Sequence, residues 1–314
     1  MCSRNLEDIV AQHTIKLDYN EGDDRHHLYS MDKKRIVYLG NRDICYKVIR
    51  DNPKYEIVKI LTFSDCALQR FLEREHSECE IITELDNDYV IQLLINLSYE
   101  ILIVNGCPFV LPASLLKSSG KILLNTHPTY LPYLRGKTPI NGCLLYDYPL
   151  GATTYCMSDK IDGGNIIYQE KVDLTPDLDL GLCYFISYTL EEKVFRRALE
   201  VLEESDYQYV GAEIDTVKYP LFKNDSDLRE LDFQKMTAAD CVRHVRAYGI
   251  EGEGCYANIK GIRYVIYDAE QVVNEYILGK MSSFKEGSVV LEYDSKKLIK
   301  CHEGILKLKK YCKI

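Results

Sequence analysis

Residues 123–136 read Leu-Leu-Asn-Thr-His-Pro-Thr-Tyr-Leu-Pro-Tyr-Leu-Arg-Gly, and Ile-Asp-Gly-Gly follows at 161–164. The first stretch continues an apolar run that begins after Lys121, and such a run predicts a buried β-strand. Side chains two positions apart share one face of a strand, so Asn125 and His127 are expected to point the same way. A strand end that presents an amide and an imidazole together is a candidate polar site.

A carboxylate is expected to join this site from the turn that follows. Pro128 limits how far the strand continues, and the Asp-Gly-Gly turn allows Asp162 to return to the strand end. An amide, an imidazole and a carboxylate suit acyl transfer, in which an oxyanion is stabilised and a proton is relayed. A lone buried histidine is more often a structural core residue, and an Asp-Gly pair is usually only a turn. The prediction of chemistry therefore depends on the whole ordered set.

This ordered set resembles the folate-dependent formyltransferase family. That family has an Asn-x-His at a strand end, a Leu-Pro-x-x-Arg-Gly loop, a Gly-x-Thr strand and an Asp-x-Gly turn. In this chain the four pieces stand at 125–127, 131–136, 151–153 and 162–164. The resemblance covers residues 34–204 in order and in spacing.

The resemblance implies formyl transfer from 10-formyltetrahydrofolate to an amine, with Asn125, His127 and Asp162 as the catalytic residues. Asn125 and His127 are then placed to bind the oxyanion, and His127 or Asp162 to take the proton of the amine. A carboxylate beside an imidazole helps to hold the ring in one orientation. Whether His127 is the base or an oxyanion donor stays open at the level of the sequence.

The loop after the fourth predicted strand is implied to hold this cosubstrate. It reads Asn-Gly-Cys-Pro-Phe-Val-Leu-Pro at 105–112. In the family this loop and the Asp turn wrap the pterin, with much of the contact from backbone amides. An ordinary strand-to-helix turn is the alternative for any one residue there. The residues implied to bind 10-formyltetrahydrofolate are Gly106, Cys107, Pro108, Phe109, Asp159 and Ile161.

Other cofactor motifs are missing from the sequence. The first predicted strand ends in Gly40-Asn41 without a G-x-G-x-x-G, so tight binding of a dinucleotide is not expected. The sequence contains no P-loop and no H-E-x-x-H, and no metal site is predicted. His26 and His27 are an alternative metal-binding pair, but they lie in a polar stretch typical of a solvated tail.

The order of elements predicts an α/β protein with two domains. Residues 34–204 alternate strands and helices, which favours a Rossmann-like, mostly parallel sheet. A long helix is expected over 182–202, because apolar residues recur there at helical spacing. Residues 1–33 are polar and predict a flexible extension. The expected strands of the first domain span 35–39, 56–61, 80–83, 100–105 and 121–125.

Residues 205–225 predict a linker, and residues 226–314 predict a smaller C-terminal domain. Thr237 is followed three residues later by Asp240, a capping-box variant that opens a short helix. The strand-like runs after it favour a β-rich open barrel, which resembles the C-terminal domain of several formyltransferases. These runs span 255–259, 263–267, 288–293, 298–301 and 305–308.

Composition and charge restrict the partners. Of the 314 residues, 46% are hydrophobic and 28% are charged, as in a globular protein. The net charge of −9 argues against a general affinity for nucleic acid. No apolar stretch reaches membrane-spanning length. The twelve cysteines show no C-x-x-C pair, so we expect reduced thiols and a cytoplasmic location.

The charge of the second domain restricts the class of substrate that we expect. Residues 205–314 hold 17 basic and 17 acidic residues, so they lack the positive surface that transfer RNA requires. A purine-pathway relative would normally end near residue 204. We therefore expect a formyltransferase for a nucleotide-linked amino sugar, such as a dTDP-4-amino-4,6-dideoxyhexose. Arg135 and Lys137 are expected to contact its phosphates, with solvated loop charges as the alternative.

Other functions remain open from the sequence. One is a methionyl-tRNA formyltransferase, and another is a 10-formyltetrahydrofolate hydrolase, which usually carries an amino-terminal regulatory domain. A non-catalytic folate-binding protein is the third, although the presence of all three predicted catalytic residues argues against it. In relatives the second domain often contributes to dimerisation, so a homodimer is expected.

Overall fold

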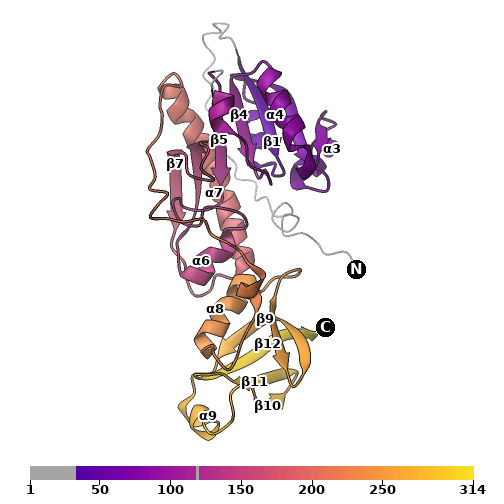
Figure 1. Ribbon diagram of the computed structural model, residues 1–314, viewed down its shortest axis with the longest axis vertical. Coiled ribbons are helices and arrows are strands. Elements are labelled where there is room, and N and C mark those ends of the chain that lie inside the picture. The colour runs from indigo at the N-terminus through magenta and orange to yellow at the C-terminus, as the bar shows by residue number, and fades with distance from the viewer. Residues whose placement is uncertain (1–32, 118–119) are drawn as a thin grey trace, which may run out of the picture.

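Two β-sheets follow one another along the chain (Figure 1). The computed structural model describes residues 33–117 and 120–314. The strands of the first sheet are β1 (Lys34–Gly40), β2 (Tyr55–Phe63), β3 (Glu80–Ile82), β4 (Ile101–Asn105), β5 (Ile122–His127), β6 (Leu150–Cys156) and β7 (Asn165–Val172). They are arranged in the order β3-β2-β1-β4-β5-β6-β7. β1 to β5 pair in parallel, whereas β6 is antiparallel to both β5 and β7. The prediction of a mostly parallel α/β sheet is confirmed.

Helices connect these strands and cover the sheet. They are α2 (Ile44–Ile49), α3 (Ala67–Arg74), the 3₁₀ turn η1 (Glu84–Asp86), α4 (Asn87–Asn96), α5 (Ala113–Lys117), α6 (Ile140–Tyr146) and α7 (Leu180–Glu204). The predicted long helix is therefore confirmed as α7, with two more residues at each end. The five strands predicted for this domain are also confirmed, whereas β7 was not predicted.

The central strands are buried on both faces, as their continuous apolar sequences require. Ile36 and Tyr38 of β1 pack into a cluster with Phe195 of α7. The alternate residues Val37 and Leu39 pack into a second cluster on the other face, together with α4 and α5. The central part of the sheet is thus a middle layer between two hydrophobic clusters.

The C-terminal part forms an antiparallel sheet of five strands beside a helix. Its elements are η2 (Ser226–Arg229), α8 (Ala238–Tyr248), β8 (Cys255–Ile259), β9 (Ile262–Gln271), α9 (Glu275–Lys280), β10 (Val289–Tyr293), β11 (Lys296–Lys300) and β12 (Ile305–Lys313). The sheet order is β10-β11-β12-β9-β8. Thr237 caps α8 by accepting a hydrogen bond from the backbone N–H of Asp240 at 3.0 Å, as predicted. The five predicted strands are confirmed, and β9 and β12 are longer than expected. The short helix α9 was not predicted.

One hydrophobic cluster crosses the boundary between the two predicted domains. It combines Leu144 of α6 and Leu180 of α7 with Val245 of α8 and Ile299 of β11. Helix α6 packs directly against α8. The amide of Asn141, which is fully buried on α6, donates to the backbone oxygen of Ala247 at 2.8 Å. The two parts therefore share a core.

The predicted linker at 205–225 packs along the first domain. Ala212 and Ile166 exchange two backbone hydrogen bonds of 2.8 Å. Phe222 donates its backbone N–H to the oxygen of Arg135 at 2.7 Å. The ring of Tyr219 meets that of Tyr133 edge-on, with centroids 5.3 Å apart. This segment is therefore part of the folded surface near the Asp turn. The extension predicted for 1–33, including the alternative metal pair His26 and His27, lies outside the described residues except for Lys33.

A buried ion pair supports the ends of the central strands. Glu191 of α7 is fully buried and lies 3.0 Å from a guanidinium nitrogen of Arg42, which follows β1. Asn105, at the end of β4, donates to the same carboxylate at 3.3 Å. Arg42 also donates to the backbone oxygen of Thr126, between the two predicted catalytic residues of β5, at 3.4 Å. The network thus joins three neighbouring strand ends to α7.

We expect Glu191→Gln to lower the free energy of unfolding by about 3 kcal/mol, because it leaves the Arg42 charge buried without its partner. Urea unfolding measures this change. The neighbouring Glu192→Gln is the matched control, because Glu192 pairs with Arg196 on the exposed face of the same helix. That control is expected to change stability by less than about 1 kcal/mol. Equal effects of the two substitutions would contradict a stabilising role for the buried pair.

Candidate functional site

The three predicted catalytic side chains meet at the end of β5. His127 Nδ1 lies 3.6 Å from Asp162 Oδ2, and both side chains are largely buried. Asn125 lies on the same face of β5 as His127, and its amide joins Asp162 through one intervening hydroxyl. The turn at 161–164 therefore returns a carboxylate to the strand end, as the sequence predicts.

Tyr155 supplies the intervening hydroxyl and was not predicted. It lies directly opposite Asn125 in the antiparallel pairing of β5 with β6. Its hydroxyl accepts from Asn125 Nδ2 at 2.7 Å and donates to Asp162 Oδ1 at 2.7 Å. Burial, reinforced by the nearby Asp162 charge, raises the pKa of Tyr155 well above its usual value. Tyr155 therefore remains a donor and fixes the orientation of both partners.

The imidazole of His127 is held by the loop that follows β5. Its Nε2 lies 3.0 Å from the backbone oxygen of Leu134. A carbonyl only accepts hydrogen bonds, so Nε2 carries the hydrogen in this arrangement. The nitrogen left for chemistry is Nδ1, which faces Asp162. The 3.6 Å between Nδ1 and the Asp162 carboxylate is too long for a direct hydrogen bond. The two groups form an ion pair only when the ring is protonated.

The backbone also holds Asp162 in place. The backbone N–H of Gly136 donates to Asp162 Oδ2 at 2.7 Å. Asp162 has a φ of +43°, in the left-handed region that non-glycine residues rarely adopt. Such a conformation persists only where the surrounding structure fixes it, and it is often found at functional sites.

The two predicted phosphate-binding residues differ in their surroundings. The guanidinium of Arg135 is buried and donates to the backbone oxygens of Ile161, Thr216 and Tyr219. This arrangement does not favour the predicted substrate contact, because four donor contacts already go to protein carbonyls. Lys137 is exposed and forms no ion pair within the described residues. Lys137 is therefore the better placed of the two for an external anion.

The loop predicted to hold folate begins directly after β4. Gly106 has a φ of +78°, and a Cβ atom there would lie 2.0 Å from Asn41 Oδ1. Only glycine fits such a position. Burial raises the pKa of the Cys107 thiol to about 12, so this side chain is a neutral group. The ring of Phe109 packs edge-on against Phe63, with centroids 6.1 Å apart.

The backbone of this loop presents unused donors. In the described parts of the chain, the N–H groups of Cys107, Phe109 and Val110 donate to no protein acceptor. These donors are therefore available to an acceptor from outside the chain. Asp159, in contrast, accepts the backbone N–H of Ser114 at the start of α5 at 2.9 Å. This bond does not favour the predicted contact of Asp159 with the cosubstrate.

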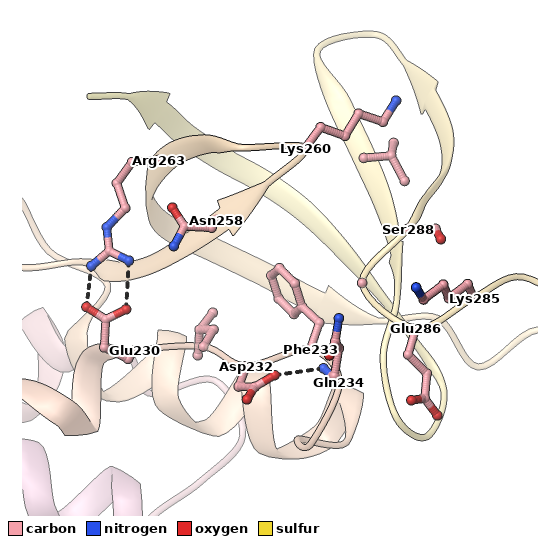
Figure 2. Close-up of a pocket in the computed structure, with 13 residues that line it drawn as sticks. Glu230, Asp232, Phe233, Gln234, Asn258, Lys260, Arg263, Lys285, Glu286 and Ser288 are labelled. Carbon is pink, nitrogen blue, oxygen red and sulfur yellow. Dashed lines mark hydrogen bonds and ion pairs between the residues drawn. The ribbon is translucent and has the colours of Figure 1, made fainter.

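A separate hollow of about 630 Å³ opens in the C-terminal domain (Figure 2). Arg263 forms a two-fold hydrogen-bonded ion pair with Glu230 at one side of it. Asp232 accepts the backbone N–H of Gln234 at 3.0 Å. The hollow contains none of the predicted site residues, so the end of β5 remains the candidate site. Its lining residues are Glu230, Leu231, Asp232, Phe233, Gln234, Asn258, Lys260, Arg263, Lys285, Glu286, Gly287, Ser288 and Val289.

Comparison with known proteins agrees with this geometry. The formyl transferase family model matches residues 64–199, and the model of the formyl transferase C-terminal domain matches residues 224–313. The chain belongs to the folate-dependent formyltransferase family. It is therefore a formyltransferase enzyme, and the site at the end of β5 lies within the part that matches the first model.

Among curated proteins, the chain is similar to the methionyl-tRNA formyltransferase of Carboxydothermus hydrogenoformans. The two are 26% identical over 273 residues, which cover 82% of this chain and 84% of that relative. Among solved structures, it is similar to the N-formyltransferase of Helicobacter canadensis in complex with folinic acid and dTDP-3-aminofucose. That match has a TM-score of 0.63 and 14% identity, and covers 89% of this chain and all of the other.

A second solved structure, a 4-N formyltransferase from Francisella tularensis, matches with a TM-score of 0.61 and 20% identity. It covers 76% of this chain and 99% of the other. These two structures share the fold of this formyltransferase, at identities too low to transfer a substrate.

Tyr155→Phe is expected to lower turnover about tenfold, which corresponds to about 1.4 kcal/mol of lost positioning. It is also expected to lower the free energy of unfolding by about 1–3 kcal/mol, because Asn125 and Asp162 each lose a partner. Steady-state kinetics and urea unfolding measure the two effects. Tyr168→Phe is the matched control, since it removes a partly exposed hydroxyl that bonds Glu170. Wild-type turnover in Tyr155→Phe would exclude the bridging role.

Proposed function

We propose that this formyltransferase transfers the formyl group of 10-formyltetrahydrofolate to the amine of a nucleotide-linked amino sugar, such as a dTDP-4-amino-4,6-dideoxyhexose. The observation that carries the chemistry is the convergence of Asn125, His127 and Asp162 at one strand end. The sugar substrate rests on the distribution of charge in the C-terminal domain, which is described below.

The loop after β4 fits a folate. Its donor N–H groups suit the acceptor atoms of a pterin, and Phe63 and Phe109 offer apolar surface beside them. Gly106, Cys107, Pro108 and Phe109 are the residues that we propose hold it. Ile161 is partly exposed on the opposing Asp turn and completes this set. Asp159 is the least favoured member, because its carboxylate already caps α5.

The three polar side chains have distinct proposed roles. When bound, 10-formyltetrahydrofolate supplies the formyl carbon that the amine attacks. The Asn125 amide, oriented by Tyr155, is placed to donate to the formyl oxygen as negative charge develops there. Asp162 is placed to take the proton that the amine loses as the new C–N bond forms. That proton passes to N10 as the bond between N10 and the formyl carbon breaks, which releases tetrahydrofolate. His127 Nδ1 faces the Asp162 carboxylate. Its proposed role is either to stabilise the negative charge that develops on the formyl oxygen or to relay the proton of the amine.

Ion pairs reduce the positive charge that the C-terminal domain offers to transfer RNA. Its last two strands are rich in lysine, but four of these side chains pair with acids on neighbouring strands or in the adjoining turn. The ion pairs are Lys296–Asp294, Lys297–Glu292, Lys307–Glu270 and Lys309–Asp268. Affinity for transfer RNA depends on clustered cations that are free to neutralise phosphates. A small substrate with two phosphates needs only a local cation, and exposed Lys137 supplies one.

Methionyl-tRNA formyltransferase is the second candidate. It is favoured by the similarity to the Carboxydothermus hydrogenoformans protein, which extends over both domains. Hydrolysis of the formyl-folate without transfer is the third outcome that the experiment must separate. The homodimer inferred from the resemblance stays a prediction. Within the described residues, no helix has the length and apolar character needed to span a bilayer.

Labelled 10-formyltetrahydrofolate with dTDP-linked amino sugars, methionyl-tRNA or buffer separates the three candidates. We expect labelled N-formyl sugar and no labelled transfer RNA. We also expect dTDP to raise the unfolding temperature, since a ligand that binds only the folded state stabilises it. Formylated methionyl-tRNA, with binding that weakens steeply in salt, would reverse the order of the first two candidates. Formate release alone would favour the hydrolase.

A further inference from the structure

We infer that Arg135 is a positioning residue that holds the Asp162 turn in its working conformation by clamping it to residues 212–222. This inference rests on the proposed function, in which Asp162 accepts the proton of the amine. It assigns to Arg135 a role different from the phosphate contact expected from the sequence. It also makes the segment between the two domains a part of the site's support.

The Arg135 guanidinium forms two hydrogen bonds with Ile161, the residue before Asp162. Nε and Nη2 of Arg135 both donate to the backbone oxygen of Ile161, at 3.0 and 2.7 Å. Asp162 itself has the left-handed φ of +43° and carries the carboxylate that faces His127. These two hydrogen bonds to the Ile161 carbonyl fix the peptide plane between Ile161 and the strained Asp162.

The remaining guanidinium nitrogen, Nη1, bonds to the segment 212–222. Nη1 of Arg135 donates to the backbone oxygens of Thr216 at 3.2 Å and Tyr219 at 2.8 Å. The backbone of Arg135 also contacts this segment, because Phe222 donates its N–H to the backbone oxygen of Arg135 at 2.7 Å. A Cβ atom at Gly163 would lie 2.8 Å from Thr216 and 3.3 Å from the guanidinium. The Asp turn, Arg135 and the segment therefore touch one another directly.

The chemistry of the side chain explains why arginine stands here. Arg135 as a whole residue is 5% exposed, and a buried cation is tolerated only where its donors are satisfied. Its rigid planar fork makes four donor contacts in fixed directions, whereas a lysine ammonium has one nitrogen on a flexible stem. Lysine at this position would keep the charge and lose the geometry. The substitution Arg135→Lys therefore separates positioning from charge.

The test compares Arg135→Lys and Arg135→Ala with the wild type. We expect kcat for formyl transfer to fall about 10²-fold in both, because a displacement of about 1 Å at a catalytic group has an effect of this size. The KM for 10-formyltetrahydrofolate should change much less than kcat, since among the proposed folate-binding residues Arg135 bonds Ile161 and none of those at 106–109 within the described chain. Guanidinium ions added to Arg135→Ala should restore part of the turnover. Amide hydrogen exchange should quicken at 158–164 and at 212–222 in both variants.

The control is Arg196→Lys, which changes an exposed arginine paired with Glu192 and should alter neither measurement. Wild-type kcat in Arg135→Lys would overturn the inference, as would unchanged exchange at 158–164, because the loss would then not act through the Asp turn. Asp162→Asn tests the proposed function separately. If that variant keeps full turnover, the proposed role of Asp162 is wrong, and the exchange measurement still decides whether Arg135 holds the turn.

Discussion

Replacing His127 by alanine is expected to lower the turnover number for formyl transfer by at least about 10²-fold, and Asn125→Ala is expected to have an effect of similar size. Each substitution removes a side chain that is proposed to stabilise the developing negative charge or to relay the proton. Little loss of stability is expected for Asn125→Ala, because within the described residues its side chain forms one hydrogen bond, to Tyr155. Labelled formyl transfer at saturating substrate measures turnover, and urea unfolding measures stability.

A matched pair of controls makes this result specific. His302 is an exposed histidine of the C-terminal domain, beside Glu286, and His302→Ala should leave turnover unchanged. Asn96→Ala removes an exposed amide that bonds the backbone of its own helix, and it should also leave turnover unchanged. Near wild-type turnover in both His127→Ala and Asn125→Ala would refute the assignment of the site.

The part of the site that lies on one strand could be predicted from the sequence. Alternation along β5 places Asn125 and His127 on one face, and an Asp-Gly-Gly turn offers the carboxylate. The apolar runs of β4 and β5 likewise predict burial on both faces, which the two clusters either side of the sheet confirm. In each case the information is local, because the period of the backbone decides it.

The supporting residues depend on pairings that no local pattern encodes. Tyr155 reaches the site because β6 runs antiparallel to β5 in a register that puts it opposite Asn125. A shift of one residue would have turned it to the other face. The sequence predicts a phosphate contact for Arg135 from its place in the loop after β5, whereas its acceptors here are carbonyls 26 to 84 positions later in the chain. Only the folded path of residues 205–225 brings them together.

Removing the C-terminal domain is the second change with a large expected effect. A chain of residues 34–225 should aggregate or lose affinity, although it still encodes the whole catalytic trio. Its α6 would expose Ile140, Leu144 and Leu145, which now pack into the cluster shared with α8. Re-exposing three such side chains costs about 4.5–9 kcal/mol, which is a large part of the about 5–15 kcal/mol that stabilises a typical domain. Size-exclusion chromatography and labelled formyl transfer measure the outcome.

The matched control is the chain of residues 34–314, which begins at the same residue and keeps the shared core. We expect it to stay soluble and active, because residues 1–33 offer no apolar face in the sequence. A milder variant, Asn141→Ala in the full chain, removes the buried amide that donates to the backbone of α8 and to the Glu253 carboxylate. It should lower the free energy of unfolding by about 1–3 kcal/mol and leave the trio intact. A soluble, monomeric and fully active 34–225 fragment would show that the second domain neither supports the site nor assembles the enzyme.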